Sequence, residues 1–197
     1  MSTARLDFLK ELGNIGAGHA TAALSRMLGN ERFELVVPEA AMLSFGDAWD
    51  YIGGPEQVVA GIYIQVMGDA HGHMAFILPV DSALRLVEIL VGGETAELDE
   101  MGLSALEEVG NIMVASYLNA LSDLTGMRLM PSVPAAAVDM AGAVWQTILA
   151  GAAVSDTLTL IKTEFMTDSV AIAGHILFLP DEKGFQIIAR RLGLEEL

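Results

Sequence analysis

The chain carries the same sequence plan twice, and this internal repeat restricts its fold more than any other feature. The segment LDFLKELGNI at 6–15 matches LSALEEVGNI at 103–112 without a gap, and GHMAFILP at 72–79 resembles GHILFLP at 174–180. After the loss of one residue, the register continues through the pairs Pro38 and Pro134, Gly46 and Gly142, Trp49 and Trp145, and Ile52 and Ile148. Each half must therefore be compatible with the same local fold.

The repeat predicts one domain, residues 1–197, built from two similar halves at about 1–97 and 98–197. Apolar residues at three- and four-residue spacing predict a long helix at the start of each half, and Val-, Ile- and Phe-rich runs joined by short polar turns predict hairpins. The expected elements are long helices at 6–28 and 103–124, short strands after Pro38 and Pro134, short helices around Trp49 and Trp145, hairpins at 57–67 with 71–79 and at 156–165 with 169–179, and closing helices at 80–92 and 181–193.

These elements predict an α+β fold. It consists of two pseudo-twofold related helix-strand-hairpin-helix halves, which pool their strands into one sheet covered by the long helices. Ser104 followed by Glu107 has the spacing of a capping box, so we expect Ser104 to begin the second long helix.

The charge balance restricts the partners of the protein. Ten basic residues against 26 acidic ones give a net charge of −16, which repels nucleic acid and anionic lipid. The absence of cysteine excludes disulfides and thiol chemistry. The most apolar long segment, 133–154, contains Pro134, Asp139 and Gln146, which favours a buried helix over a membrane span. We expect a cytoplasmic protein without a nucleic-acid partner or membrane insertion.

Three glycines in the segment KELGNIGAGHA raise the question of a phosphate-binding loop. The second half has Met113 and Ala115 where the first has Gly16 and Gly18, and no Lys-Ser/Thr pair follows. We therefore predict that this segment is helix rather than a phosphate-binding loop. Because glycine in a helix costs about 1 kcal/mol relative to alanine, we expect Gly13 to permit a close approach to a neighbouring element.

Both long helices carry Glu and Asn three residues apart, as Glu11 with Asn14 and as Glu108 with Asn111. At 100° per residue, each pair falls on one polar stripe together with an earlier Asp7 or Ser104. Such a stripe is also typical of any exposed helix, and Ser104 can be interpreted simply as a helix cap. Asparagine, however, is a poor helix former, and its occurrence twice at one register favours function as much as structure.

The repeated pattern resembles the CheC/CheX/FliY family of chemotaxis phosphatases. It consists of Asp or Ser, then Glu four residues later, Asn three residues after that, and a proline some two dozen residues further on. In this chain the two copies are Asp7, Glu11, Asn14, Pro38 and Ser104, Glu108, Asn111, Pro134. The phrase ELGNIGAG followed by ATAALS is similar to the CheC type, and two copies rather than one argue against a CheX type.

The resemblance implies hydrolysis of the aspartyl phosphate of a CheY-type response regulator. In this reading Asn14 and Asn111 orient the attacking water, while Glu11 and Glu108 anchor the regulator. The protein would need no cofactor of its own, because the regulator brings Mg²⁺. CheD is implied as a further partner of the second half, around residues 140–156, a segment that is shorter and less acidic than is typical of the CheC type.

Two alternatives belong to other functional classes. The first is a non-catalytic adaptor that binds phosphorylated CheY or CheD and tunes receptor adaptation or the flagellar switch. The second is a structural adaptor that uses the twofold symmetry to bridge partners. Intact Glu and Asn pairs in both halves favour the enzyme over either adaptor.

Three histidines and two tryptophans are further candidates. His71 and His73 lie two residues apart beside Asp69, a spacing that fits either a metal site or an ordinary hairpin, and the hairpin is favoured because the second half lacks the first histidine. His19 follows the glycines, where CheC-type relatives commonly carry Asn, and we expect a structural role for it. The tryptophans at matched positions are expected in the core rather than at an interface.

Overall fold

The computed structural model describes residues 3–27, 34–44, 46–93, 97–150, 157–166 and 171–193. The elements of the first half are α1 (Thr3–Met27), β1 (Glu34–Ser44), α2 (Ala48–Ile52), β2 (Val58–Gly68), β3 (Gly72–Pro79) and α3 (Val80–Val91). Those of the second half are α4 (Glu100–Thr125), β4 (Leu129–Pro131), β5 (Ala135–Met140), α5 (Ala141–Ala150), β6 (Thr157–Met166), β7 (Ala171–Pro180) and α6 (Glu182–Arg191). The order of elements is the same in both halves, except that β4 is added in the second.

All strands join one antiparallel sheet, in the order β1-β6-β7-β3-β2-β4, with β5 also paired to β2. The two hairpins meet at its centre, where β3 pairs with β7 and Ala75 lies opposite Leu177. The strands that follow each long helix pair with the hairpin of the other half: β1 pairs with β6, and both β4 and β5 pair with β2. The predicted pooled sheet with pseudo-twofold symmetry is confirmed.

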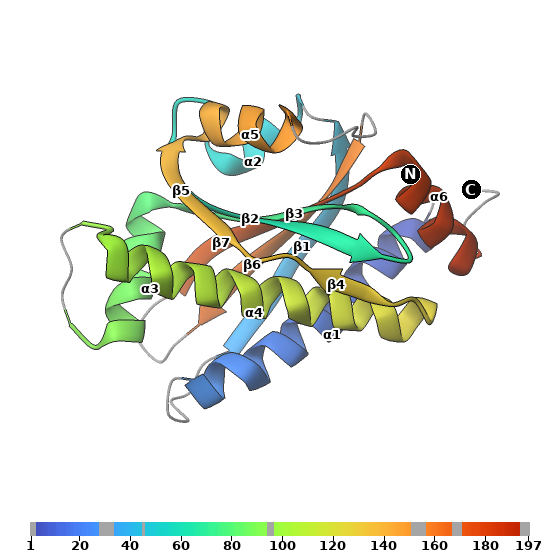
Figure 1. The fold of residues 1–197 in the computed structure, drawn as a ribbon, viewed down its shortest axis with the longest axis horizontal. Coiled ribbons are helices and arrows are strands. Elements are labelled where there is room, and N and C mark those ends of the chain that lie inside the picture. Colours follow the sequence, from blue (N-terminus) through green and yellow to red (C-terminus); the bar gives the residue numbers. More distant parts are fainter. Residues whose placement is uncertain are drawn as a thin grey trace.

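Helices cover both faces of this sheet (Figure 1). The long helices α1 and α4 pack against each other and form one core with the sheet, around side chains such as Leu24, Ile62 and Leu106. The short helices α2 and α5 cover part of the opposite face, where Trp145 is only 3% exposed. The long helices therefore cover one face only. Trp145 is a core residue as expected, whereas the Trp49 side chain lies outside the described part of the structure.

The glycines of α1 lie in helix, as predicted, and two of them allow close packing. A Cβ atom added at Gly16 would lie 2.6 Å from Cδ1 of the Tyr117 ring in α4, and one at Gly13 would lie 3.0 Å from Val37 in β1. By contrast, Gly18 has no heavy atom within 4 Å of such a Cβ. The helix crossing therefore requires glycine at position 16 but not at position 18.

Two local expectations are wrong. The cap of α4 is Asp99, whose side-chain Oδ1 accepts the N–H of Gly102 at 2.8 Å, so the helix begins before Ser104 and leaves that residue in its second turn. The first strand does not follow Pro38 but contains it, because β1 begins at Glu34 and has a register irregularity between Val36 and Glu39 that accommodates a residue without an N–H.

The apolar segment 133–154 forms β5 and α5 over its described residues, rather than a single helix. In the part of the chain that the structure describes, no helix combines the length and the apolar character needed to cross a membrane.

Candidate functional site

The four residues of the second motif lie around one groove. Ser104, Glu108 and Asn111 line it from α4, and Pro134 lines it from the segment just before β5. The groove is open to solvent and has a volume of about 540 Å³. Its remaining lining residues are Met101, Ala105 and Glu107.

Helical spacing explains why these side chains share a face. Residues separated by four and then three positions lie one above another on a helix, which places Ser104, Glu108 and Asn111 in a row. The opposite side of α4 is buried, with Leu106 and Val109 fully enclosed in the core. Burial of that apolar side fixes the rotation of the helix and directs the polar row outwards: Glu108 is exposed and Asn111 half-buried.

The first motif is also exposed, on α1. Glu11 and Asn14 both face solvent. Asn14 lines a second groove of about 460 Å³, between α1 and β1, whose other lining residues are Ala17, Gly18, Thr21, Glu34, Leu35, Val36 and Val37. Glu11 is not among the residues that line this groove. The side chains of Asp7 and Pro38 lie outside the described residues, so the first motif is described only in part.

The four predicted side chains are not used as internal braces. Within the described ranges, none of Glu11, Asn14, Glu108 and Asn111 forms a hydrogen bond or ion pair with another residue. Their polar atoms are therefore available to water and to an incoming molecule.

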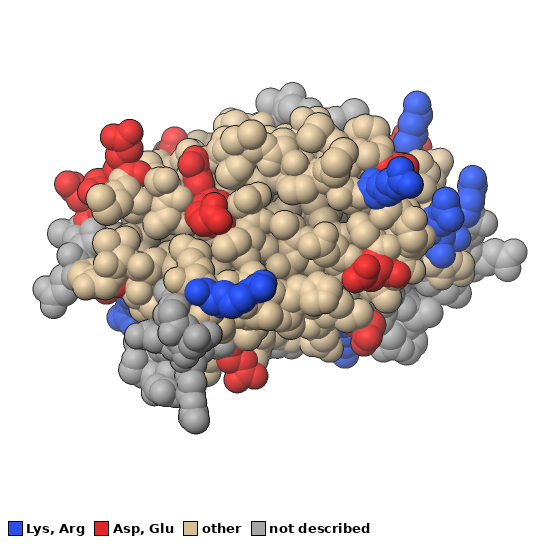
Figure 2. Space-filling model, turned by 60° about the horizontal axis from the view of Figure 1, so that its bottom comes forward, with Lys and Arg blue, Asp and Glu red and all other residues tan. Residues whose placement is uncertain are grey.

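The grooves contain no positive charge of their own. Among the residues that line either of them, none is a lysine, arginine or histidine. On the face turned forward in Figure 2, acidic and basic side chains lie scattered among larger uncharged areas. These lining side chains therefore offer no cationic group to an anionic ligand.

The strands beside the grooves are tied to the helices by side chains. In the second half, the Glu107 Oε1 atom accepts the N–H of Ala136 at 3.1 Å. In the first half, the Thr21 Oγ1 atom accepts the N–H of Leu35 at 3.0 Å. Sequence reasoning considered Glu107 only as a capping partner and missed its place in the groove. The available signal was its position directly before Glu108.

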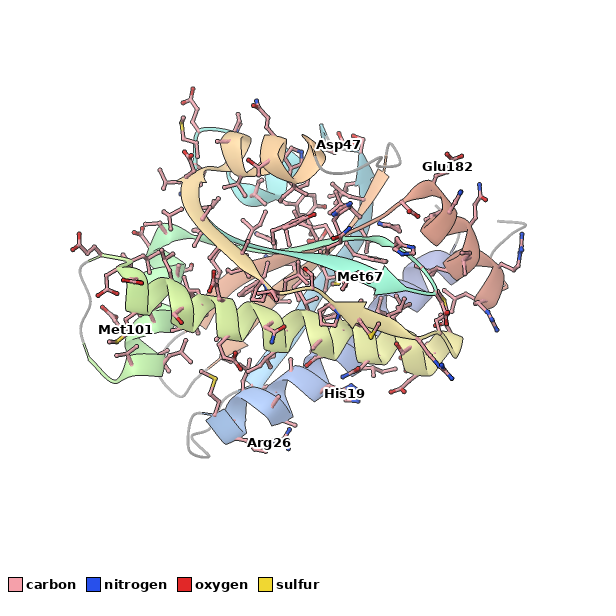
Figure 3. The ribbon with its side chains drawn as sticks, in the orientation of Figure 1. His19, Arg26, Asp47, Met67, Met101 and Glu182 are labelled. Atoms are coloured by element: carbon pink, nitrogen blue, oxygen red, sulfur yellow. The ribbon has the colours of Figure 1, made fainter. Side chains whose placement is uncertain are left out.

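Met101 is the other lining residue that sequence reasoning missed. It lies at the beginning of α4 and is 64% exposed (Figure 3). Its position three residues before Ser104 places it on the same side of the helix. The groove therefore has an apolar end as well as a polar row.

Of the three candidate histidines, His73 packs within the hairpin. The Nδ1 atom of His73 lies 2.5 Å from the hydroxyl of Tyr63, and the two rings are stacked with centroids 5.6 Å apart. Burial lowers the pKa of His73, against an opposing influence of Asp181. His71 is exposed, and the described residues contain no group of three or more potential metal ligands. The predicted hairpin is present, because β2 and β3 pair on either side of the turn that contains His71. His19 is exposed on α1 (Figure 3).

Comparisons with known proteins identify the family of this chain. Residues 101–137, which contain the second motif, match the model of the CheC-like family. The chain is 36% identical over 197 residues to a Bacillus subtilis (strain 168) protein named CheY-P phosphatase CheC. The alignment covers 96% of this chain and 94% of the relative.

Two solved structures have the same fold. Thermotoga maritima FliY superposes with a TM-score of 0.79 at 18% identity, over 100% of this chain and 99% of that one. CheX in the Borrelia burgdorferi CheX-CheY-BeF3-Mg complex superposes with a TM-score of 0.54 at 17% identity, over 86% and 97% of the respective chains.

Proposed function

The chain belongs to the CheC-like family, and on this premise we propose that it is a phosphatase that hydrolyses the aspartyl phosphate of a CheY-type response regulator. The Bacillus relative is named for this activity. The CheX neighbour was solved with CheY, beryllofluoride and magnesium. A regulator with an acidic, metal-binding phosphorylation site is therefore the partner that fits this chain.

The observation that carries the proposal is the groove that gathers the whole second motif. Asn111 and Glu108 lie side by side on its wall, and their side chains have no partner among the described residues. An amide cannot remove a proton, but it both donates and accepts hydrogen bonds and can hold a water molecule in line with phosphorus. In the proposal Asn111 positions the water, and Glu108 pairs with a cation of the regulator.

The motif of α1 forms the first centre in the same proposal, and the motif of α4 forms the second. In the first centre Asn14 would orient water, and Glu11 would anchor the regulator. Ser104 and Pro134 support the second centre as parts of its groove. Asp7 and Pro38 are proposed as their counterparts in the first.

The remaining requirements of the reaction are proposed to come from the regulator. It would hold the Mg²⁺ ion that balances the charge of the phosphoryl group, and its own lysine would meet the glutamate. CheD binding at the second half, around α5, is a separate proposal, which a pull-down of purified CheD with this protein would test.

Phosphate release from a purified, phosphorylated CheY-type regulator tests the proposal. The protein should accelerate release, and Asn14→Ala with Asn111→Ala in one chain should abolish the acceleration. Asn119→Ala is the matched control, because Asn119 is an exposed asparagine two turns further along α4. Circular dichroism would verify that all variants keep the fold.

Two results would contradict the proposal. An unchanged rate in the double variant would remove the asparagines from the mechanism. Binding of the phosphorylated regulator without any acceleration of phosphate release would instead support the adaptor.

A further inference from the structure

Glu107 connects the candidate site to the edge of the sheet. It lies half-buried on α4, directly before Glu108, and it lines the same groove as Asn111. Its Oε1 atom accepts the N–H of Ala136 at 3.1 Å, two residues after Pro134. One carboxylate therefore joins the helical wall of the groove to its opposite wall.

The position of β5 explains why this bond matters. Within the described residues, β5 pairs only with β2, so the N–H groups on its other side have no strand to bond to. The N–H of Ala136 donates a hydrogen bond to Glu107, and the N–H of Met140 donates one to the Oδ1 atom of Asp139 at 2.7 Å. At Ala136 a side chain of α4 replaces the missing strand and holds this part of β5 against the helix.

The first half lacks the chemical means for the same bond. The residue that matches Glu107 in the repeat is Lys10, which can donate hydrogen bonds but cannot accept one. There the helix is joined to the strand by the hydrogen bond between Thr21 and Leu35. Thr21 lies seven residues after Asn14, and Leu35 lies three residues before Pro38. In the second half, the residues of the corresponding hydrogen bond lie on the other side of the motif: Glu107 precedes Asn111, and Ala136 follows Pro134.

We propose that Glu107 is a positioning residue of the second centre. By holding Ala136, it fixes the Pro134 wall and thereby sets the width of the groove in which Asn111 holds water. The inference rests on the proposed phosphatase function and adds to it a residue that contacts neither phosphorus nor water. Because Glu107 acts through the groove wall, its loss affects the turnover of bound regulator more than the binding of regulator.

The activity test uses the full chain with one centre disabled at a time. In the Asn14→Ala background, Glu107→Ala should lower kcat by about tenfold, the equivalent of one charged hydrogen bond, and change KM by less than about twofold. Glu107→Gln keeps an oxygen acceptor and should restore most of the rate. Glu107→Lys, which copies Lys10, should behave like the alanine variant.

Two comparisons separate positioning from a general structural effect. The loss of kcat caused by Glu107→Ala should be at least about fivefold smaller in the Asn111→Ala background, where only the first centre works. Asp123→Ala, an exposed acid on the same helix, is the matched control for removal of a negative charge. Equal losses in both backgrounds, or a loss that appears only in KM, would overturn the proposal.

Amide hydrogen exchange gives a readout that does not depend on activity. The amide of Ala136 should exchange about tenfold faster in Glu107→Ala and stay slow in Glu107→Gln, while the neighbouring amides that bond to β2 stay protected. Unchanged exchange at Ala136 would refute the tie itself. If the Asn14→Ala parent shows no phosphatase activity although Ala136 is protected through Glu107, the proposed function of this centre fails while the tie stands.

Discussion

Tyr117 carries a buried hydroxyl at the crossing of α1 and α4, and Tyr117→Phe should stabilise the protein. The side chain is 1% exposed, and its oxygen has no hydrogen-bond partner within the described structure. Burial also raises the pKa of this phenol, so the hydroxyl stays protonated and needs an acceptor that is missing. The hydroxyl therefore costs stability in the folded state.

The surroundings indicate that water does not remove this cost. A cavity of about 10 Å³ adjoins the ring, and its lining, besides Tyr117, is apolar: Leu12, Met74, Leu118, Leu121, Ile161 and Phe178. A buried water needs at least this volume and two or more polar partners. Removing an unsatisfied buried hydroxyl recovers part of a penalty of about 1–3 kcal/mol. We expect the free energy of unfolding to rise by about 1 kcal/mol.

Urea unfolding followed by tryptophan fluorescence, together with thermal unfolding, measures this change. For a chain of this length, 1 kcal/mol corresponds to a rise in Tm of about 2–4 °C. Tyr63→Phe is the matched control with the opposite sign, because the Tyr63 hydroxyl bonds Nδ1 of His73 and its loss should cost about 1 kcal/mol. Destabilisation of Tyr117→Phe by 1 kcal/mol or more would show that the hydroxyl has a partner and would refute the reasoning.

Two further predictions concern packing and pH. Gly16→Ala should destabilise the protein by about 2 kcal/mol in urea unfolding, because the new Cβ would meet the Tyr117 ring at 2.6 Å. Gly18→Ala, where a Cβ has space, should stabilise the protein by about 1 kcal/mol. Equal effects of the two substitutions would contradict the described helix crossing. Burial, and to a lesser extent the charge of Lys162, lower the pKa of His175 to about 4, although the charge of Glu39 acts to raise it. The unfolded chain therefore binds a proton at His175 that the folded one does not, so stability is fully present above about pH 6.5 and falls, by up to about 3 kcal/mol, as the pH drops towards 4. Urea midpoints between pH 4.5 and 7.5 should show this slope, and His175→Gln should flatten it.

The sequence was sufficient for features that depend on local periodicity. The outward row of Ser104, Glu108 and Asn111 follows from spacings of three and four residues in a helix with one apolar side. Likewise, the repeat alone predicted one pooled sheet. The helical state of Gly16 followed from its replacement by Met113 in the second half. In each case the information lies within one element or in its copy.

Contacts between distant segments could not be predicted in this way. The bond from Glu107 to Ala136 joins residues 29 positions apart and depends on how β5 sits beside α4. The cap at Asp99 competed with a well-formed capping pattern at Ser104, and only the packed helix shows which residue begins it. The covering of the second sheet face depends on contacts of α2 and α5 with strands of both halves, which no local pattern encodes.

The crossing of β1 to β6 and of β5 to β2 makes each half of the chain incomplete by itself. A fragment ending after α3 would contain the β2–β3 hairpin but not the strand that borders it, and its own β1 would have nothing to join. A chain with one copy of the repeat would meet both needs by exchanging strands with an identical chain. Fusion of two such copies turns that association into an intramolecular one, which holds at any dilution and leaves the two helices free to diverge separately.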